Sequence, residues 1–254
     1  MLHVVNTRPG DRALGLTTVL QQTGYQVSSL PLLELIAEPF DDQLQQQLIQ
    51  IRMTDIVVVV SPTAVELGLT YLQQLNIELA SLTCQWVAVG QGTAEMLQQA
   101  GIFPQVPAIE TSEGMLALDV FQVSGQPVTI MFWRGHGGRT LMLQTLQAQQ
   151  QHTMSVNLYR RQLPAASKQQ YISLLQNLPD VLLISSGASW QHWLQLGTEH
   201  GPLIPPYILV LGERVQQLVK NDVQRLQANS QIILLSDLQP DSILQALQQL
   251  QKCL

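Results

Sequence analysis

Four short segments repeat one pattern, in which an apolar run ends in serine or glycine and the start of a helix follows. These segments are residues 55–61, 86–90, 180–186 and 207–212. A continuous apolar run bounded by such turn residues is typical of a strand buried on both faces, as in a parallel sheet covered by helices. Because the pattern occurs on both sides of residue 154, it predicts an α/β protein made of two similar halves.

The expected strands divide into two groups. The central group lies at 57–60, 86–89, 103–106, 128–133 and 154–159, and the other has two early strands, near 3–7 and 25–27, and three late ones, at 181–184, 207–211 and 231–235. The two early strands cannot form a stable sheet alone, so we expect them to join the late ones. This predicts two doubly wound parallel-sheet domains, one inserted into the other. The boundaries are 1–33 plus 164–254 and 37–156, with strand-like linkers at about 30–37 and 156–164.

The composition excludes several classes of protein. The chain has 254 residues, of which 46% are hydrophobic and 12% charged, and its formal net charge of -6 argues against an extended basic surface for nucleic acid. The two cysteines, Cys84 and Cys253, have neither metal-ligand nor disulfide spacing. The sequence begins without the pattern of a signal peptide, and no apolar stretch approaches the ~18 residues of a membrane span. We expect a reduced, cytoplasmic protein without a nucleic-acid or membrane partner.

Small, glycine-bearing loops follow the expected strands and open helices. Such loops expose backbone N–H groups at the positive end of a helix dipole, and they lie at the carboxyl ends of the strands, where open α/β sheets bind ligands. Five of the twelve Lys and Arg residues, Arg8, Arg134, Arg139, Arg160 and Arg161, lie at or near these loops. We interpret them as a local site for an anion, with the edges of the two sheets facing each other across a cleft. Ordinary helix caps and surface arginines remain the alternative for any single loop.

Other motifs do not indicate a cofactor. Gly90 and Gly92 begin a dinucleotide-like pattern, but Glu95 stands where the third glycine should allow close helix packing. The loop from His136 to Gly138 is similar to an esterase oxyanion loop, yet the chain has no G-x-S-x-G motif. The five histidines lack metal-ligand spacing, so we expect neither a cofactor nor a metal, and His136 is the one histidine considered as an acid or base.

Tyr159 is the candidate catalytic residue. It stands on the strand expected to connect the two domains, directly before Arg160 and Arg161. A phenol stays protonated at neutral pH and can donate a proton to a leaving hydroxyl group. The alternative is that Tyr159 only packs within the linker.

In their order along the chain, the strand-end loops resemble the uroporphyrinogen-III synthase family over essentially the whole sequence. The matching motifs are Thr7-Arg8-Pro9, Ser61, Val89-Gly90-x-x-Thr93, Ser112-Glu-Gly114, Arg134-Gly135-x-x-Gly138-Arg139, Tyr159-Arg160, Ser185-Ser186 and Leu211-Gly212. There are departures: Pro62 and Thr63 follow Ser61 where the family often has a small or Asn-containing turn, Ile184 stands where a second Thr-Ser pair would begin, and Val215 replaces a hydroxyl residue.

The resemblance implies a cofactor-free cyclising lyase that acts on hydroxymethylbilane, a linear tetrapyrrole rich in carboxylates. The substrate loses its terminal hydroxyl group, and the enzyme inverts the last pyrrole through a spiro intermediate before closing the type III ring. The resemblance assigns Tyr159 to the leaving group. We expect a monomer, in which a closing cleft is easiest, and a transient hand-over of substrate from hydroxymethylbilane synthase. Substrate binding is expected at Thr7, Arg8, Ser61, Thr63, Gly90, Thr93, Ser112, Arg134, Gly135, Arg139, Arg160, Ser185, Ser186 and Gly212.

Two alternatives are left open by the residues themselves. The first is a two-lobe binding protein for a small anionic ligand with no catalysis, which would not convert hydroxymethylbilane. The second is a nucleotide-sugar transferase, which would share the two-lobe cleft but lacks a convincing nucleotide loop and would be protected against heat by UDP-sugars.

Overall fold

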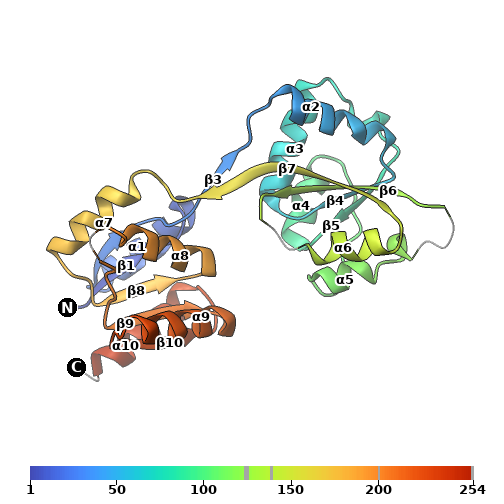
Figure 1. The fold of residues 1–254 in the computed structure, drawn as a ribbon. Helices are drawn as coiled ribbons and strands as arrows, with labels where there is room; N and C mark the ends of the chain where they lie inside the picture. Colours follow the sequence, from blue (N-terminus) through green and yellow to red (C-terminus); the bar gives the residue numbers. More distant parts are fainter. Residues whose placement is uncertain (123–125, 138–139, 200, 253–254) are drawn as a thin grey trace. The chain divides into compact units, whose positions relative to one another are not determined.

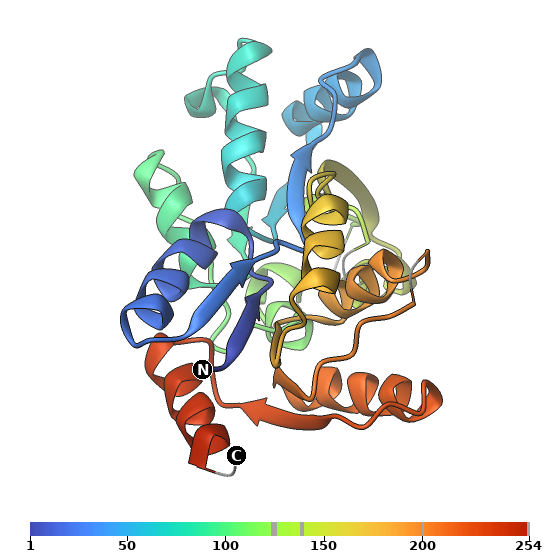
Figure 2. The same ribbon diagram turned by 90° about the vertical axis from the view of Figure 1, so that its left-hand side faces the viewer.

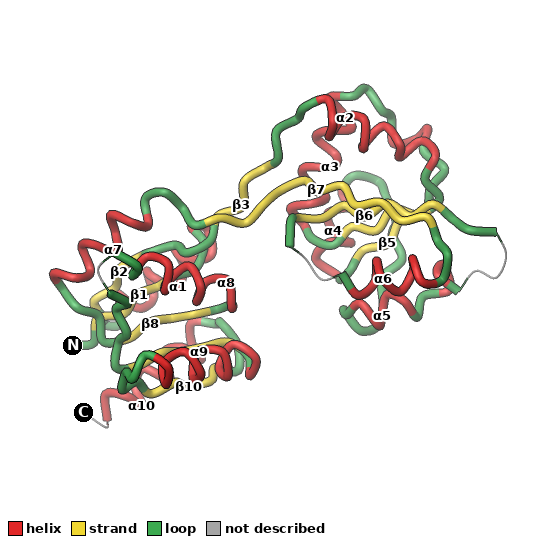
Figure 3. The backbone as a smooth tube through the Cα atoms, in the orientation of Figure 1, coloured by secondary structure: helices red, strands yellow, loops and turns green. Residues whose placement is uncertain are grey.

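The computed structural model describes residues 1–122, 126–137, 140–199 and 201–252 of the chain (Figures 1 and 3). It divides into two compact units, unit 1 (Met1–Glu34 and Gln162–Leu254) and unit 2 (Leu35–Arg161). The chain passes between them in β3 (Glu34–Ala37) and returns in β7 (His152–Gln162), and these two strands lie side by side. Tyr159 therefore belongs to unit 2.

Unit 1 is a five-stranded parallel sheet in the order β10-β9-β8-β1-β2. One face packs on α7, α8 and α9 through a cluster that includes Trp190 and Trp193, and the other packs on α1 and α10 (Figure 2). Its elements are β1 (His3–Asn6), α1 (Gly10–Gln22), β2 (Gln26–Ser29), α7 (Ser167–Gln176), β8 (Val181–Ile184), α8 (Gly187–Leu196), β9 (Tyr207–Leu211), α9 (Glu213–Arg225), β10 (Gln231–Leu235) and α10 (Pro240–Lys252).

Unit 2 is a second five-stranded sheet in the order β3-β7-β6-β4-β5. Helices α2, α3 and α4 cover one face, and α5 and α6 cover the other, so the valines of β4 are buried on both sides. Its remaining elements are α2 (Asp42–Ile49), η1 (Gln50–Met53), β4 (Ile56–Val59), α3 (Pro62–Gln74), η2 (Leu79–Ser81), β5 (Gln85–Ala88), α4 (Gln91–Gln99), α5 (Ser112–Leu116), η3 (Asp119–Phe121), β6 (Thr129–Gly135) and α6 (Leu141–Ala148). The predicted fold class is confirmed.

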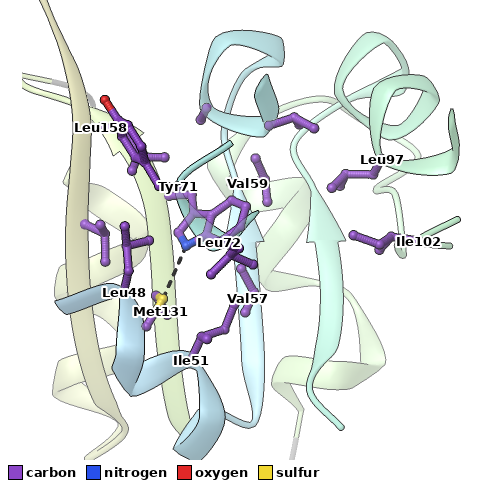
Figure 4. Close-up of a cluster of buried hydrophobic side chains, with 14 of the residues drawn as sticks. Leu48, Ile51, Val57, Val59, Tyr71, Leu72, Leu97, Ile102, Met131 and Leu158 are labelled. Carbon is purple, nitrogen blue, oxygen red and sulfur yellow. Dashed lines mark hydrogen bonds between the residues drawn. The ribbon is translucent and has the colours of Figure 1, made fainter. Parts of the chain in front are cut away.

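The packing of α3 on the sheet of unit 2 depends on one close approach. Trp133 of β6 is fully buried, and its indole N–H contacts the sulfur of Met131 at 3.3 Å (Figure 4). A Cβ atom at Gly68 of α3 would overlap the Trp133 ring, so the helix can lie this close only because residue 68 has no side chain. Interiors are packed to nearly crystalline density, and such a contact fixes the position of α3.

The strand predicted at 103–106 is wrong. Only Gln105 bridges Val87 there, and the fifth strand of this sheet is instead β3. Pro107 has no N–H for the next hydrogen bond of the ladder, so the pairing does not continue past the bridge. Strand β3 runs antiparallel to β7. The Glu38 N–H donates to the Leu158 carbonyl, whereas the earlier residue Glu34 accepts from Nε2 of the later residue Gln162.

Three details of the helices concern the sequence pattern and the expected site residues. Helix α7 was not predicted, although the apolar spacing of Tyr171, Leu174 and Leu175 is helical. Ser61 is the N-cap of α3, and Thr63 lies inside the first turn of that helix. Helix α6 begins at Leu141, and Arg139, one of the expected binding residues, lies outside the described residues.

Candidate active site

In each unit the order of the strands reverses once, and the expected site residues gather there. In unit 2 the chain runs from β4 outward to β5 and then returns to place β6 on the other side of β4. In unit 1 the corresponding reversal lies between β1 and β8. Loops diverge at such a point and leave a crevice outside the carboxyl ends of the strands. In unit 2, Ser61 follows β4 and Gly135 ends β6, and in unit 1, Thr7 and Ser185 follow β1 and β8.

A β-bulge directs Tyr159 toward the start of α3. The register of β6 with β7 shifts between Arg134, which pairs with Asn157, and Gly135, which pairs with Tyr159. The extra residue, Leu158, places Tyr159 opposite Gly135 and in the same buried cluster as Trp133. In a regular strand, Leu158 and Tyr159 would point to opposite faces of the sheet, whereas the bulge lets both face the same cluster.

The Tyr159 hydroxyl group is hydrogen-bonded with Ser61. The two oxygens lie 3.0 Å apart, and Ser61 Oγ also accepts a hydrogen bond of 3.1 Å from the Ala64 N–H as the N-cap of α3. The Tyr159 residue is only 2% exposed, whereas Ser61 is partly exposed. A Cβ atom at Gly135 would overlap the Tyr159 ring, so a glycine is needed where the phenol crosses β6.

Two arginines flank the Tyr159 phenol. Arg134 is 7% exposed, and its burial lowers the pKa of the guanidinium, while its charge interaction with Tyr159 acts in the opposite direction. The Cζ atom of Arg161 lies 5.6 Å from the centre of the Tyr159 ring, within the range of a cation–π contact. Negative charge that develops on the phenol oxygen would therefore form close to two cations.

Arg160 and His136 both contact Glu38, which sequence analysis did not identify. Arg160 Nη1 lies 3.0 Å and His136 Nε2 3.5 Å from Glu38 Oε1. The His136 N–H donates to the Tyr159 carbonyl, and the Tyr71 hydroxyl donates to the Glu38 carbonyl. Glu38 also contributes to a raised pKa of Tyr71, after the larger effect of burial. Nothing local in the sequence pairs residue 38 with residue 160.

The carboxylate of Glu110 is bound at the start of helix α4. Gly90 is the N-cap of this helix, Thr93 is buried in its first turn, and Glu110 Oε1 accepts a hydrogen bond of 2.7 Å from the Gln91 N–H. Ser112 begins α5 and is buried, but the cap of that helix is Thr111.

The expected site residues of unit 1 are mainly engaged in the fold. The Thr7 hydroxyl donates to the Leu183 carbonyl across the switch point, and Arg8 donates to the Leu238 carbonyl at 3.1 Å. Burial, followed by repulsion from Arg12, lowers the pKa of Arg8.

Two further unit 1 positions open helices. Ser186 caps α8 by accepting from the Ser189 N–H, and Ser185 precedes it. Gly212 precedes α9 with φ at +82°, a conformation that favours glycine. Each of these residues lies at the carboxyl-end edge of the unit 1 sheet, as the sequence predicts.

One hollow of unit 2 lies apart from this cluster. It has a volume of about 550 Å³ and lies at the amino-terminal ends of the strands, lined by Asp55, Asp119 and their neighbours. Two carboxylates make it unfavourable for an anion. Within the described residues, no group of three or more His, Cys, Asp or Glu side chains could hold a metal ion. No helix in this part of the chain is long and apolar enough to cross a membrane.

Comparison with known proteins gives one consistent result. The family described as Uroporphyrinogen-III synthase HemD matches residues 15–232. A solved structure of a mutant uroporphyrinogen III synthase from the extremely thermophilic bacterium Thermus thermophilus is similar over 99% of this chain and 100% of that chain, with a TM-score of 0.70 and 14% identity. Uroporphyrinogen-III synthetase from Helicobacter pylori is similar over 98% and 100%, with a TM-score of 0.57 and 12% identity. At these identities the structures show the shared fold.

Proposed function

The chain belongs to the uroporphyrinogen-III synthase family of cyclising lyases, and we propose that its substrate is hydroxymethylbilane and that Tyr159 and Ser61 supply the proton for the departing hydroxyl group. The observation that carries this proposal is the 3.0 Å contact between the two hydroxyl oxygens at the switch point of the unit 2 sheet. A buried phenol beside a partly exposed serine forms a short route from the interior to the site.

The geometry supports a proton relay. Tyr159 is too deeply buried to meet a substrate directly, but Ser61 is partly exposed and already accepts from the Ala64 N–H. Ser61 donates its proton to the terminal hydroxyl of the substrate while it takes the proton of Tyr159. The C–O bond breaks as the electron pair of the pyrrole nitrogen moves toward the exocyclic carbon, water leaves, and a protonated azafulvene that still carries its N–H remains.

The charge left on the Tyr159 oxygen is stabilised nearby. Arg134 and Arg161 both lie close to the ring, and in a partly buried site such charges act more strongly than in water. When the azafulvene is attacked and the ring closes, a pyrrole carbon loses its proton, and one proton returns the phenolate to the phenol. The net change is the loss of one water molecule from the substrate.

The remaining catalysis is positioning. The azafulvene closes without an enzyme to the symmetric type I ring, so formation of type III requires that attack occur at the substituted carbon of the terminal pyrrole. Holding the substrate's carboxylates at fixed points imposes that conformation. The helix starts after β4 and β5 and the arginine of β6 offer such points in unit 2, as Thr63, Gly90, Thr93 and Arg134.

Product analysis tests the function. The protein is mixed with freshly prepared hydroxymethylbilane, and the porphyrins are separated as isomers after oxidation. We expect the type III isomer to predominate over the type I isomer that forms spontaneously. Type I alone, at the rate seen without protein, would rule out the synthase activity.

We further propose that the protein acts without a cofactor, in the cytoplasm and as a monomer, and that it receives hydroxymethylbilane by transient hand-over from hydroxymethylbilane synthase. The spontaneous closure of the substrate supports the hand-over, because direct transfer shortens the time in which the type I ring can form. Light scattering of the purified protein tests the monomer. A mixture of both enzymes that gives no more type III product than free substrate does would contradict the hand-over.

A further inference from the structure

A carboxylate of the protein itself occupies the start of helix α4. Glu110 Oε1 accepts from the N–H of Gln91, the first residue of that helix, at 2.7 Å. A Cβ atom at Gly90 would overlap the Glu110 carboxyl group, so the glycine makes room for it. Unpaired N–H groups and the helix dipole favour an anion at this place. The bound side chain shows that this helix start binds a carboxylate.

The turn that carries Glu110 is fixed on both sides. The Thr111 N–H donates to the Ile109 carbonyl at 2.7 Å, and Thr111 Oγ1 accepts from the Gly114 N–H at 3.0 Å as the cap of α5. A Cβ atom at Gly114 would overlap the Ile109 carbonyl, so this turn needs its glycine. These contacts order the backbone of the turn, from which the Glu110 side chain reaches α4.

The Glu110 side chain nevertheless remains exchangeable. Glu110 is exposed, and no basic side chain pairs with it among the described residues. Its carboxylate can therefore leave the helix start by rotation of the side chain, without breaking an ion pair or opening the core.

We propose that Glu110 occupies the anion site of the substrate-free protein and must leave it before a carboxylate of the substrate binds at Gly90 and Thr93. This rests on the proposed function, because it concerns the same site. Two carboxylates repel each other and cannot share the same N–H donor. The apparent affinity is then reduced by the fraction of molecules in which Glu110 is bound.

This exchange makes Glu110 a specificity-determining residue. A ligand with a single carboxylate gains nothing elsewhere that offsets the loss of the Glu110 contact. A ligand with several carboxylates also contacts other loops and can displace the side chain. The competing internal anion therefore discriminates against small acids and favours a polycarboxylate.

Arg160 shows the same arrangement at a second expected binding residue. Its guanidinium pairs with the carboxylate of Glu38 at 3.0 Å, and Glu38 is one-fifth exposed. Two positions chosen for binding substrate carboxylates are thus in contact with carboxylates of the chain. This independent pair supports the exchange at Glu110.

The test compares Glu110→Gln with Glu95→Gln. Glu95 lies on the same helix and is exposed, so its replacement changes the net charge equally. It contacts only the side-chain amide of Gln91, at 3.5 Å, and glutamine keeps an oxygen that can accept there, so the Gln91 backbone N–H is unaffected. The measurements are KM for hydroxymethylbilane and the dissociation constant for uroporphyrin III, a stable octacarboxylate, followed by fluorescence. For Glu110→Gln we expect both to fall by about three- to ten-fold at unchanged kcat, because the displaced contact is a charge-assisted bond to a helix start. Glu95→Gln should match the wild type.

Unchanged or weaker porphyrin binding by a folded Glu110→Gln variant would overturn the inference, as would an equal gain in Glu95→Gln. Glu110→Ala is the second variant, because it leaves no side-chain acceptor at all, and it should bind at least as tightly as Glu110→Gln. Folding is checked by circular dichroism. If the wild type forms no type III product but the Glu110 variants still bind porphyrin more tightly, the proposed function fails and the inference about Glu110 stands.

Discussion

Replacing Tyr159 with Phe separates the proposed proton transfer from packing. The phenyl ring still fills the space beside Gly135, and the variant loses one hydrogen bond, that to Ser61. Such a bond contributes about 0.5–1.5 kcal/mol to the free energy of unfolding. Loss of a general acid slows a reaction by about 10²- to 10⁴-fold, which corresponds to about 2.7–5.4 kcal/mol at the transition state. The expected loss of activity therefore exceeds any effect of a partly unfolded population.

Ser61 variants test the relay itself. Ser61→Ala removes the exposed end of the relay and the N-cap of α3, which costs about 1 kcal/mol of stability, whereas Ser61→Thr retains a hydroxyl that can cap. We expect Tyr159→Phe and Ser61→Ala to lower the rate of type III formation to a similar extent, the double variant to be no slower than either, and Ser61→Thr to recover much of the activity.

The assay is single-turnover conversion of hydroxymethylbilane, with separation of porphyrin isomers and a urea denaturation curve for each variant. Because the uncatalysed reaction gives type I, lost catalysis appears as a rise in that isomer. A rate within about three-fold of the wild type for Tyr159→Phe would show that the phenol only packs, since a general acid contributes far more. An inactive Tyr159→Phe beside a fully active Ser61→Ala would refute the relay.

Close contacts in unit 2 give three more expected outcomes. Gly135→Ala should displace the Tyr159 ring, lowering the free energy of unfolding by roughly 1–3 kcal/mol in urea titration and reducing kcat as well; an unchanged kcat would contradict the assigned position of the phenol. Gly68→Ala should destabilise unit 2 by a similar roughly 1–3 kcal/mol through Trp133 while leaving kcat of the folded protein unchanged. Arg134→Ala should raise KM, by about ten-fold or more if the guanidinium binds a substrate carboxylate, and should lower kcat through the lost charge beside Tyr159; unaltered KM and kcat together would make its role structural.

Sequence reasoning located the strand ends but not the contacts between them. Buried apolar strands and small helix-opening loops are local features, so Ser61, Gly135 and Gly212 could be placed at the correct sheet edge from pattern alone. The partner of Arg160 could not, because Glu38 is brought to it by pairing of β3 with β7 across more than a hundred residues. Strand β3 was itself expected as a strand-like linker and not as a member of the unit 2 sheet, since a strand at the edge of a sheet carries no continuous apolar run.

The β-bulge in β7 beside Gly135 brings the Tyr159 hydroxyl group to Ser61. A shift of one residue in a strand moves side chains to the opposite face, so a regular β7 would place Tyr159 among the helices α5 and α6 instead of at the start of α3. The bulge alone is not sufficient, because the ring then crosses β6 at a point where any Cβ atom would overlap it. The inserted residue in β7 and the glycine in β6 therefore act together, and either one without the other would leave Ser61 without its phenol.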